Sequence, residues 1–202
     1  MWEWLGSVVG YILGFASAVA AEPVRQWLLR PQLEMEFDPR FGAGSRFISL
    51  TPERVEIDGI QRRRQSMYVR MALRNKSTFL TARGCRAYLS RIDRREADGN
   101  FRTIHSDPLP VPWAWLTTDP IDIHPEMRFF FDVLAVNDEE NLIVPQTRPK
   151  PLIWDTTLKN PASYRFTMVV SAENGKPKQL TLGVEWNGRF ELLQEDCFSI
   201  VE

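Results

Sequence analysis

The sequence predicts an all-β domain, an antiparallel β-sandwich over residues 31–202, preceded by a transmembrane helix and a short juxtamembrane helix over residues 1–30. Three observations carry this prediction. The chain begins with a long uncharged segment, later segments alternate apolar and polar residues, and hairpin-type turns separate those segments. No helix-length pattern follows Arg30, so strands are expected to build the folded domain.

Composition and charge narrow the class of protein. The chain has 202 residues, with 25 Lys and Arg against 26 Asp and Glu and a formal net charge of −1. Its 25% charged and 44% hydrophobic residues exclude a mainly disordered chain. The near-neutral charge gives no basis for nucleic-acid binding, and no nucleic-acid partner is expected. Two cysteines and two histidines exclude a disulfide-dense scaffold and a multi-cysteine zinc site.

The N-terminal segment Trp4–Ala21 has 18 consecutive uncharged residues, which would extend about 27 Å as a helix. This length nearly matches the hydrocarbon core of a bilayer, and Trp2 and Trp27 lie where interfacial aromatic residues are expected. Two alternatives stay open. The Ala-Val-Ala of residues 18–20 resembles a signal-peptide cleavage pattern, although no basic residue precedes the apolar stretch. A buried core helix is the other alternative.

The flanking charges predict the orientation of this segment. Arg25 and Arg30 follow it, whereas Glu3 and the amino terminus precede it. The positive-inside rule then places the C-terminal domain in the cytoplasm, with a single span in a bacterial inner membrane. Residues 22–30 should continue as an amphipathic helix at the level of the lipid headgroups, ending at Pro31.

Small residues recur every four positions within the predicted span, at Gly6, Gly10, Gly14 and Ala18. This spacing places them on one stripe of a helix, where a second helix can approach closely. The stripe predicts pairing of the span, with a second copy or with another membrane protein. The alternative is that these glycines reflect only the composition of membrane helices.

Residues 31–202 are expected to form seven or eight strands, because apolar and polar residues alternate with a period of two. Turn residues at 98–100, 174–175 and 187–188 predict hairpins between them. Long proline-bearing connections are expected at 41–64, 106–126 and 137–161. The alternation directs Cys85, a small apolar side chain, into the core. The clearest strands are predicted at 33–38, 67–73, 85–90, 128–133, 164–171, 180–187 and 191–201.

Several segments resemble those of poorly characterised bacterial single-pass membrane proteins with an immunoglobulin-like β-sandwich beside the membrane. The segments are RPQLEMEF, YVRMALRNKSTFLTARGCRAYLSRI, IDIHPEMRFFFDV and YRFTMVVSAENGKPKQLTLGVEWNGRF, and the resemblance covers most of the chain. It implies an antiparallel immunoglobulin-like sandwich after one transmembrane helix. It implies no activity, because the shared motifs are structural.

The sequence contains no nucleophile elbow, no phosphate-binding lysine loop and no HExxH zinc motif. His105 and His124 flank a loop with three aspartates, which makes a metal site conceivable, but surface positions are the simpler interpretation. We therefore expect no catalytic residues, no metal site and no cofactor, and we expect that the protein is not an enzyme.

Two other features are candidate interaction sites. Residues 22–102 hold 17 Lys and Arg against 10 Asp and Glu, and 103–202 hold 8 against 15. The densest basic clusters are Arg62, Arg63 and Arg64 and a second group at 91–95, which either attract anionic headgroups or are simply solvated. The stiff proline-rich loop 108–116 carries Trp113 and Trp115, which either contact a partner or cap the core.

The sequence therefore predicts a membrane-anchored, non-catalytic interaction or accessory module that acts through its sandwich and through pairing of its transmembrane helix. Its expected partners are the lipid bilayer and a protein, which could be a second copy. The alternative is an exported β-sandwich that binds a carbohydrate or another ligand after its signal peptide is cleaved.

Overall fold

The computed structural model describes residues 30–40, 45–57, 60–114, 117–151, 154 and 158–201. The predicted span and its alternatives lie outside these residues. In the described part of the chain, no helix has both the length and the apolar character needed to cross a bilayer.

Two antiparallel sheets make up the described chain, which confirms the predicted all-β, sandwich-like class. One sheet has the strand order β1-β3-β8-β9, with β2 also paired to β3. Its strands are β1 (Leu33–Glu36), β2 (Ile48–Ile57), β3 (Ile60–Asn75), β8 (Arg128–Asn137) and β9 (Ile143–Pro145). The other sheet has the order β12-β11-β10-β4-β5, with β6 and β7 also paired to β4. Its strands are β4 (Ala82–Arg95), β5 (Phe101–His105), β6 (Leu109–Val111), β7 (Ile121–Ile123), β10 (Ala162–Ser171), β11 (Lys178–Trp186) and β12 (Phe198–Val201).

The hydrophobic core lies between the two sheets and follows the predicted alternation. In β10, Tyr164, Phe166, Met168 and Val170 are each at most 1% exposed. Cys85 of β4 is fully buried as expected, and burial raises the pKa of its thiol to about 11. Strands with one face toward a core show this period because successive side chains point to opposite faces of a sheet.

The predicted connection 41–64 is wrong, because β2 and the first part of β3 lie within it. Pro52 in β2 suggested a loop, since proline cannot donate a hydrogen bond to a sheet ladder. The structure accommodates Pro52 because β2 pairs with β3 alone and is therefore an edge strand. The pairing continues without interruption from Ile48 opposite Val69 to Ile57 opposite Ile60.

Three short strands also occur within predicted connections. β6 and β7 lie in 106–126 and pair with β4, and β9 lies in 137–161 and pairs with β8. Each has only three residues, too few to show a period in the sequence. The predicted final strand 191–201 is shorter than expected, because turns of 3-10 helix at Phe190–Leu192 and Glu195–Cys197 precede β12.

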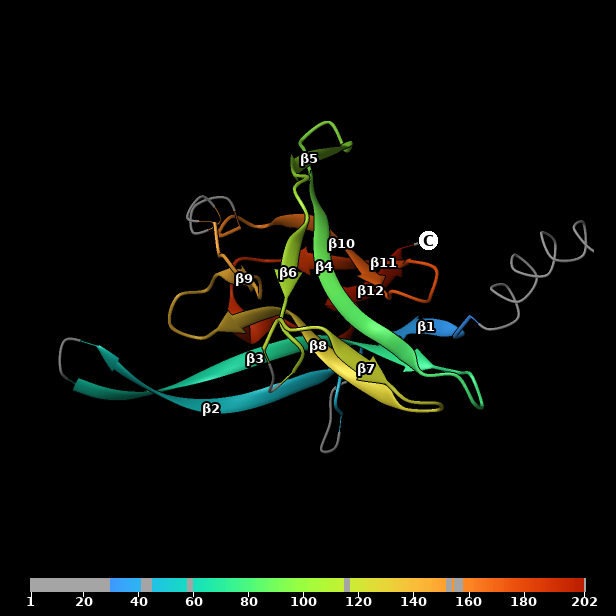
Figure 1. Ribbon diagram of the computed structural model, residues 1–202. Helices are drawn as coiled ribbons and strands as arrows, with labels where there is room; N and C mark the ends of the chain where they lie inside the picture. The colour runs from blue at the N-terminus through green and yellow to red at the C-terminus, as the bar shows by residue number, and fades with distance from the viewer. Residues whose placement is uncertain are drawn as a thin grey trace, which may run out of the picture.

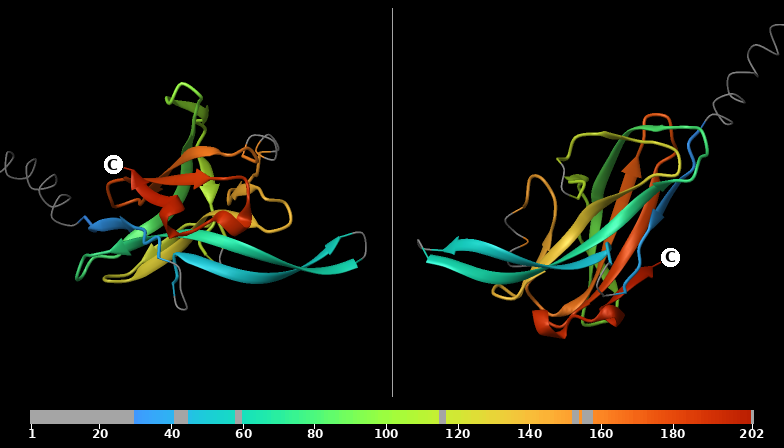
Figure 2. Two further views of the ribbon diagram at one scale, coloured as in Figure 1. Left: turned by 180° about the vertical axis from the view of Figure 1, so that it is seen from behind. Right: turned by 90° about the horizontal axis from the view of Figure 1, so that it is seen from below.

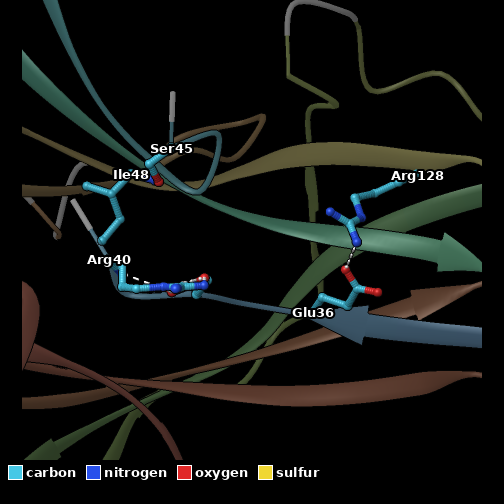
Figure 3. A network of polar contacts seen from close by, with 6 residues as sticks. Glu36, Arg40, Ser45, Ile48 and Arg128 are labelled. Carbon is cyan, nitrogen blue, oxygen red and sulfur yellow. Dashed lines mark hydrogen bonds and ion pairs between the residues drawn. The ribbon is translucent and has the colours of Figure 1, made fainter. Parts of the chain in front are cut away.

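β1 is attached to its sheet by charged side chains as well as by strand pairing. Glu36 forms ion pairs with Arg128 of β8 at 2.7 Å and with Arg74 of β3 at 3.8 Å. Figure 3 shows Glu36 and Arg128 pointing toward each other across β3. After β1, Arg40 pairs with Asp38, and the Ile48 N–H donates to Ser45 Oγ at the start of β2.

Two ends of the molecule differ in shape. The hairpin of β2 and β3 extends beyond the other strands, as Figure 1 shows, and we name residues 53–57 and 60–64 the arm. The opposite end contains Arg30, where the described chain begins, and the loops 76–81, 124–127 and 172–177. We name this group the loop end. Figure 2 shows from two further sides that the loop end and the arm point in different directions.

Candidate functional site

The arm is a two-stranded ribbon because neither of its two segments pairs with any other strand of the described chain. β3 pairs with β8 only from Ser66 onward, and β2 pairs with β3 alone. Side chains on one face of this ribbon are exposed, among them those of Arg54, Arg63 and Gln65. The arm therefore presents side chains to solvent at a distance from the core, as a surface for binding would require.

The other face of the arm carries a cluster around Glu53. Arg64 Nε donates to Glu53 Oε2 at 2.8 Å, and the Tyr68 hydroxyl donates to Glu53 Oε1. Burial acts to raise the pKa of Glu53, but the hydrogen bonds from Tyr68 and Arg64 outweigh it and lower the pKa. Burial and the nearby carboxylate raise the pKa of Tyr68 to about 12. Glu53 is therefore ionised and neutralises Arg64.

Arg54 and Arg63 are directly opposite each other in the register of the arm. Both side chains are exposed, and neither forms an ion pair with another described residue. Like charges directly opposite each other weaken a pair of strands, so this arrangement costs stability. Two exposed guanidinium groups on one face suit an acidic partner surface, because each can donate several hydrogen bonds to carboxylates.

The arginines of the second basic cluster, at 91–95, each have a partner within their own hairpin. Arg91 pairs with Asp93 at 3.0 Å, Arg94 pairs with Glu96 at 3.5 Å, and Arg95 donates to the Gly99 carbonyl at 3.1 Å. These residues belong to the β4–β5 hairpin, which also projects from the sandwich. The hairpin thus supplies partners for its own arginines, whereas Arg54 and Arg63 form no ion pair with another described residue.

The loop end is bound together by side chains that cap backbone groups. Asn75 is fully buried, and its Nδ2 donates to the carbonyls of Leu80 at 2.6 Å and Ile123 at 2.9 Å. Its Oδ1 accepts from the Ser77 N–H at 3.1 Å. These hydrogen bonds therefore join the loop 76–81 to β7 across the end of the sandwich.

Asn174 performs the same role for the loop between β10 and β11. Its Nδ2 donates to the Thr81 carbonyl, and its Oδ1 accepts from the Arg83 N–H, both at 2.9 Å. The Gln32 N–H donates to Ser77 Oγ at 2.8 Å, which attaches the start of β1 to the same group. The loop end is thus one connected surface.

An open groove of about 640 Å³ lies at the loop end between β1 and β11. It forms because β12 pairs with β11 only from Thr181 to Val184, which leaves Lys178–Leu180 without a paired strand on that side in the described chain. The charged residues lining this groove are Arg30, Glu34, Lys76, Lys176 and Lys178. A second hollow beside it is lined by Phe79, Arg83 and Glu173, among others.

The structure separates the residues predicted as interaction sites. Arg63 and Arg64 lie in the arm, with Arg63 exposed and Arg64 paired to Glu53. Arg62 belongs to the same strand, but its side chain lies outside the described residues, as does Trp115. The stripe Gly6, Gly10, Gly14 and Ala18 also lies outside them, so helix pairing stays a prediction.

Trp113 needs a correction, because its ring is 1% exposed and cannot contact a partner from the surface. It forms an isolated antiparallel bridge with Phe131, and the two rings pack edge to face at 5.8 Å. The proline-rich loop thus turns Trp113 inward, which agrees with its alternative interpretation as part of the core.

The two histidines contact groups other than metal ligands. His105 Nε2 lies 2.6 Å from the Asp107 carbonyl oxygen, and its ring packs edge to face on Trp154. His124 Nδ1 lies 3.2 Å from the Thr81 hydroxyl. Within the described ranges, no three His, Cys, Asp or Glu residues gather in a group that could hold a metal ion.

Comparison with known proteins gives no match, either to a family model or to a curated protein.

Proposed function

We propose that the protein is a membrane-anchored, non-catalytic interaction module that holds a protein partner with its arm. The observation that carries this proposal is the opposed pair Arg54 and Arg63, exposed on a ribbon that extends beyond the sandwich. Two arginines that face each other and form no ion pair with another described residue favour an external anion.

The anchor in this proposal is the uncharged segment Trp4–Ala21. Only eight residues separate it from Arg30, and even a fully extended chain of that length reaches no more than about 30 Å. The loop end would therefore lie close to the bilayer. The arm extends from the other side of the molecule, which favours a protein partner over the lipid of the same membrane.

The same proposal includes an immunoglobulin-like fold for the sandwich. Two antiparallel sheets around one core, joined largely by hairpins and end loops, support an immunoglobulin-like sandwich. Sandwiches of this kind commonly serve as rigid supports for the loops and hairpins that bind partners.

The anchor and its orientation can be tested on the full chain in bacterial membranes. We expect the protein to stay in the membrane pellet after washing with alkaline carbonate. A reporter that is active only in the periplasm should give no signal when fused after Glu202, because the proposed orientation keeps that end in the cytoplasm. Release by carbonate, or a strong periplasmic signal, would overturn this part of the proposal.

The arm can be tested by placing a photo-crosslinking amino acid at Arg63 in the full chain. We expect one discrete crosslinked product in membranes, which disappears when Arg54→Glu reverses the neighbouring charge. The matched variant Arg148→Glu reverses an exposed charge outside the arm and should keep the product. A crosslinker at exposed Glu191 should give none, and equal products from both positions would contradict the proposal.

A further inference from the structure

We infer that the loop end docks on the anionic headgroups of the bilayer, so that the domain lies against the membrane that anchors it. This inference rests on the proposed function for bringing the loop end to the bilayer. It adds a second, separate contact with lipid, made by the folded domain itself.

The charge of the two hollows at the loop end favours this occupant. Together they are lined by five basic residues and two acidic ones: Arg30, Lys76, Arg83, Lys176 and Lys178, with Glu34 and Glu173. Lys76 pairs with Glu34 at 2.5 Å. Arg30, Lys176 and Lys178 are exposed and form no ion pair with another described residue. Each such basic residue near an anionic leaflet contributes to its attraction.

An exposed aromatic side chain lies beside these charges. Phe79 is 74% exposed in the loop 76–81, the largest exposed fraction of any large hydrophobic side chain in the described chain. An exposed aromatic ring next to basic residues matches the chemistry of the headgroup region, which is apolar on one side and anionic on the other.

Acidic side chains at the loop end limit the orientations in which this surface can face an anionic bilayer. Asp122 accepts from the Gly84 N–H at 2.9 Å, and Glu126 is exposed beside Met127. Neither residue lines the groove between β1 and β11 or the hollow beside it. The basic groove and Phe79 are thus expected to face the lipid, with the β7–β8 turn tilted away from it.

The loop end is preorganised for such a contact. Asn75 and Asn174 fix the loops through hydrogen bonds to the backbone. Binding therefore does not cost the conformational entropy of ordering these loops. A rigid surface can place several charges on the headgroups at once.

The test uses the full chain reconstituted in lipid nanodiscs. An environment-sensitive dye is attached at Phe79→Cys, with a lipid-borne quencher in the disc, while the native thiols of Cys85 and Cys197 are buried. Discs of pure phosphatidylcholine are compared with discs containing about 30% phosphatidylglycerol. We expect strong quenching at position 79 in the anionic discs and weaker quenching in the neutral ones.

Two controls assign the effect to this surface. The same dye at Leu50→Cys, an exposed position next to the arm, should be quenched little in either disc. The triple variant Arg30→Gln, Lys176→Gln and Lys178→Gln should lower the ratio of docked to undocked domains about 100-fold. A matched triple, Arg102→Gln, Arg148→Gln and Arg189→Gln, removes the same charge at exposed positions outside both proposed surfaces and should leave the ratio unchanged.

The outcomes separate this inference from the proposed function. If the chain stays in the discs but quenching is equally weak at positions 79 and 50, the loop end does not bind lipid headgroups, although the anchor is intact. That result would indicate an acidic protein as the partner of the loop end. A chain released by carbonate would overturn the anchor. That chain is then added to the same lipids from outside, where quenching at position 79 that depends on phosphatidylglycerol still supports the surface and its absence overturns it.

Discussion

At the loop end, hydrogen bonds between side chains and the backbone join two loops, β7 and the start of β1, and two of these bonds are buried. In the arm, two strands pair only with each other, and one cluster around Glu53 supports them. Asn75 at the loop end is fully buried, whereas Arg54 and Arg63 in the arm face solvent. The arm is proposed to bind a protein and the loop end to bind lipid headgroups, but different interactions stabilise the two regions.

This difference predicts different free energies of opening for the two regions. Buried polar groups lose much more when a partner is removed than exposed ones do, because water cannot replace the lost hydrogen bond. The loop end should therefore open only when the whole domain unfolds. The arm should open locally, at a lower free energy.

The largest effect is expected for Asn75→Ala. This change leaves two carbonyls and one N–H at the loop end without their partner, and we expect the free energy of unfolding to fall by about 4 kcal/mol. Urea unfolding of the full chain in detergent, followed by circular dichroism, measures it. The neighbouring exposed Thr78→Ala should change the value by less than about 0.5 kcal/mol. A loss for Asn75→Ala no larger than that of the control would contradict the comparison.

Asp132→Ala tests the part of β3 that follows the arm and pairs with β8 in the sheet. Arg70 is 7% exposed, and its Nε donates to Asp132 Oδ1 at 2.7 Å. Removing the carboxylate leaves a buried guanidinium without this partner, so we expect a loss of about 3 kcal/mol in the same unfolding experiment. Exposed Glu191→Ala removes a carboxylate at the surface and serves as the control. Similar losses for the two variants would show that the pair is not important.

Glu53→Gln is expected to act on the arm alone. It weakens the hydrogen bonds from Arg64 and Tyr68, so the free energy of local opening should fall by about 1 kcal/mol without a matching change in global unfolding. Hydrogen exchange of the amides of residues 61–64 measures this opening. An equal change throughout the sandwich would show that the arm and the core unfold together.

The pH dependence of the two carboxylates should differ in sign. The pKa of Glu53 is lowered in the folded state, so its contribution is full above its ordinary value of 4.5 and is lost as the pH falls through its folded pKa. Burial raises the pKa of Asp132, and Arg70 offsets this only in part, so its protonation at low pH favours the folded state. On acidification, the stability of the wild type should fall relative to Glu53→Gln and rise relative to Asp132→Asn.

The smallest effect is expected for Arg54→Glu. Opposite charges would then face each other across the arm, and its opening free energy should rise by about 0.5 kcal/mol in the same exchange experiment. The proposed partner contact should weaken at the same time. A variant that stabilises the arm and still crosslinks normally would separate the arm's charge from its proposed function.

Local sequence patterns were sufficient to predict the all-β, sandwich-like class and much of the core. Alternation over 164–171 placed Tyr164, Phe166, Met168 and Val170 on the buried face, because a strand with one face toward a core has no other way to sort its side chains. The same pattern placed Cys85 in the core. Signals of this kind are local, so they survive without knowledge of what lies across the sheet.

The tertiary structure decided everything that depends on a distant partner. Pro52 lies in a strand because β2 is an edge, and Trp113 is buried because Phe131 lies beside it. The loop end brings Arg30 together with Lys176 and Lys178, which are far apart along the chain. No local pattern encodes such neighbours, because contacts between remote segments depend on how the two sheets pack and which strand edges they leave open.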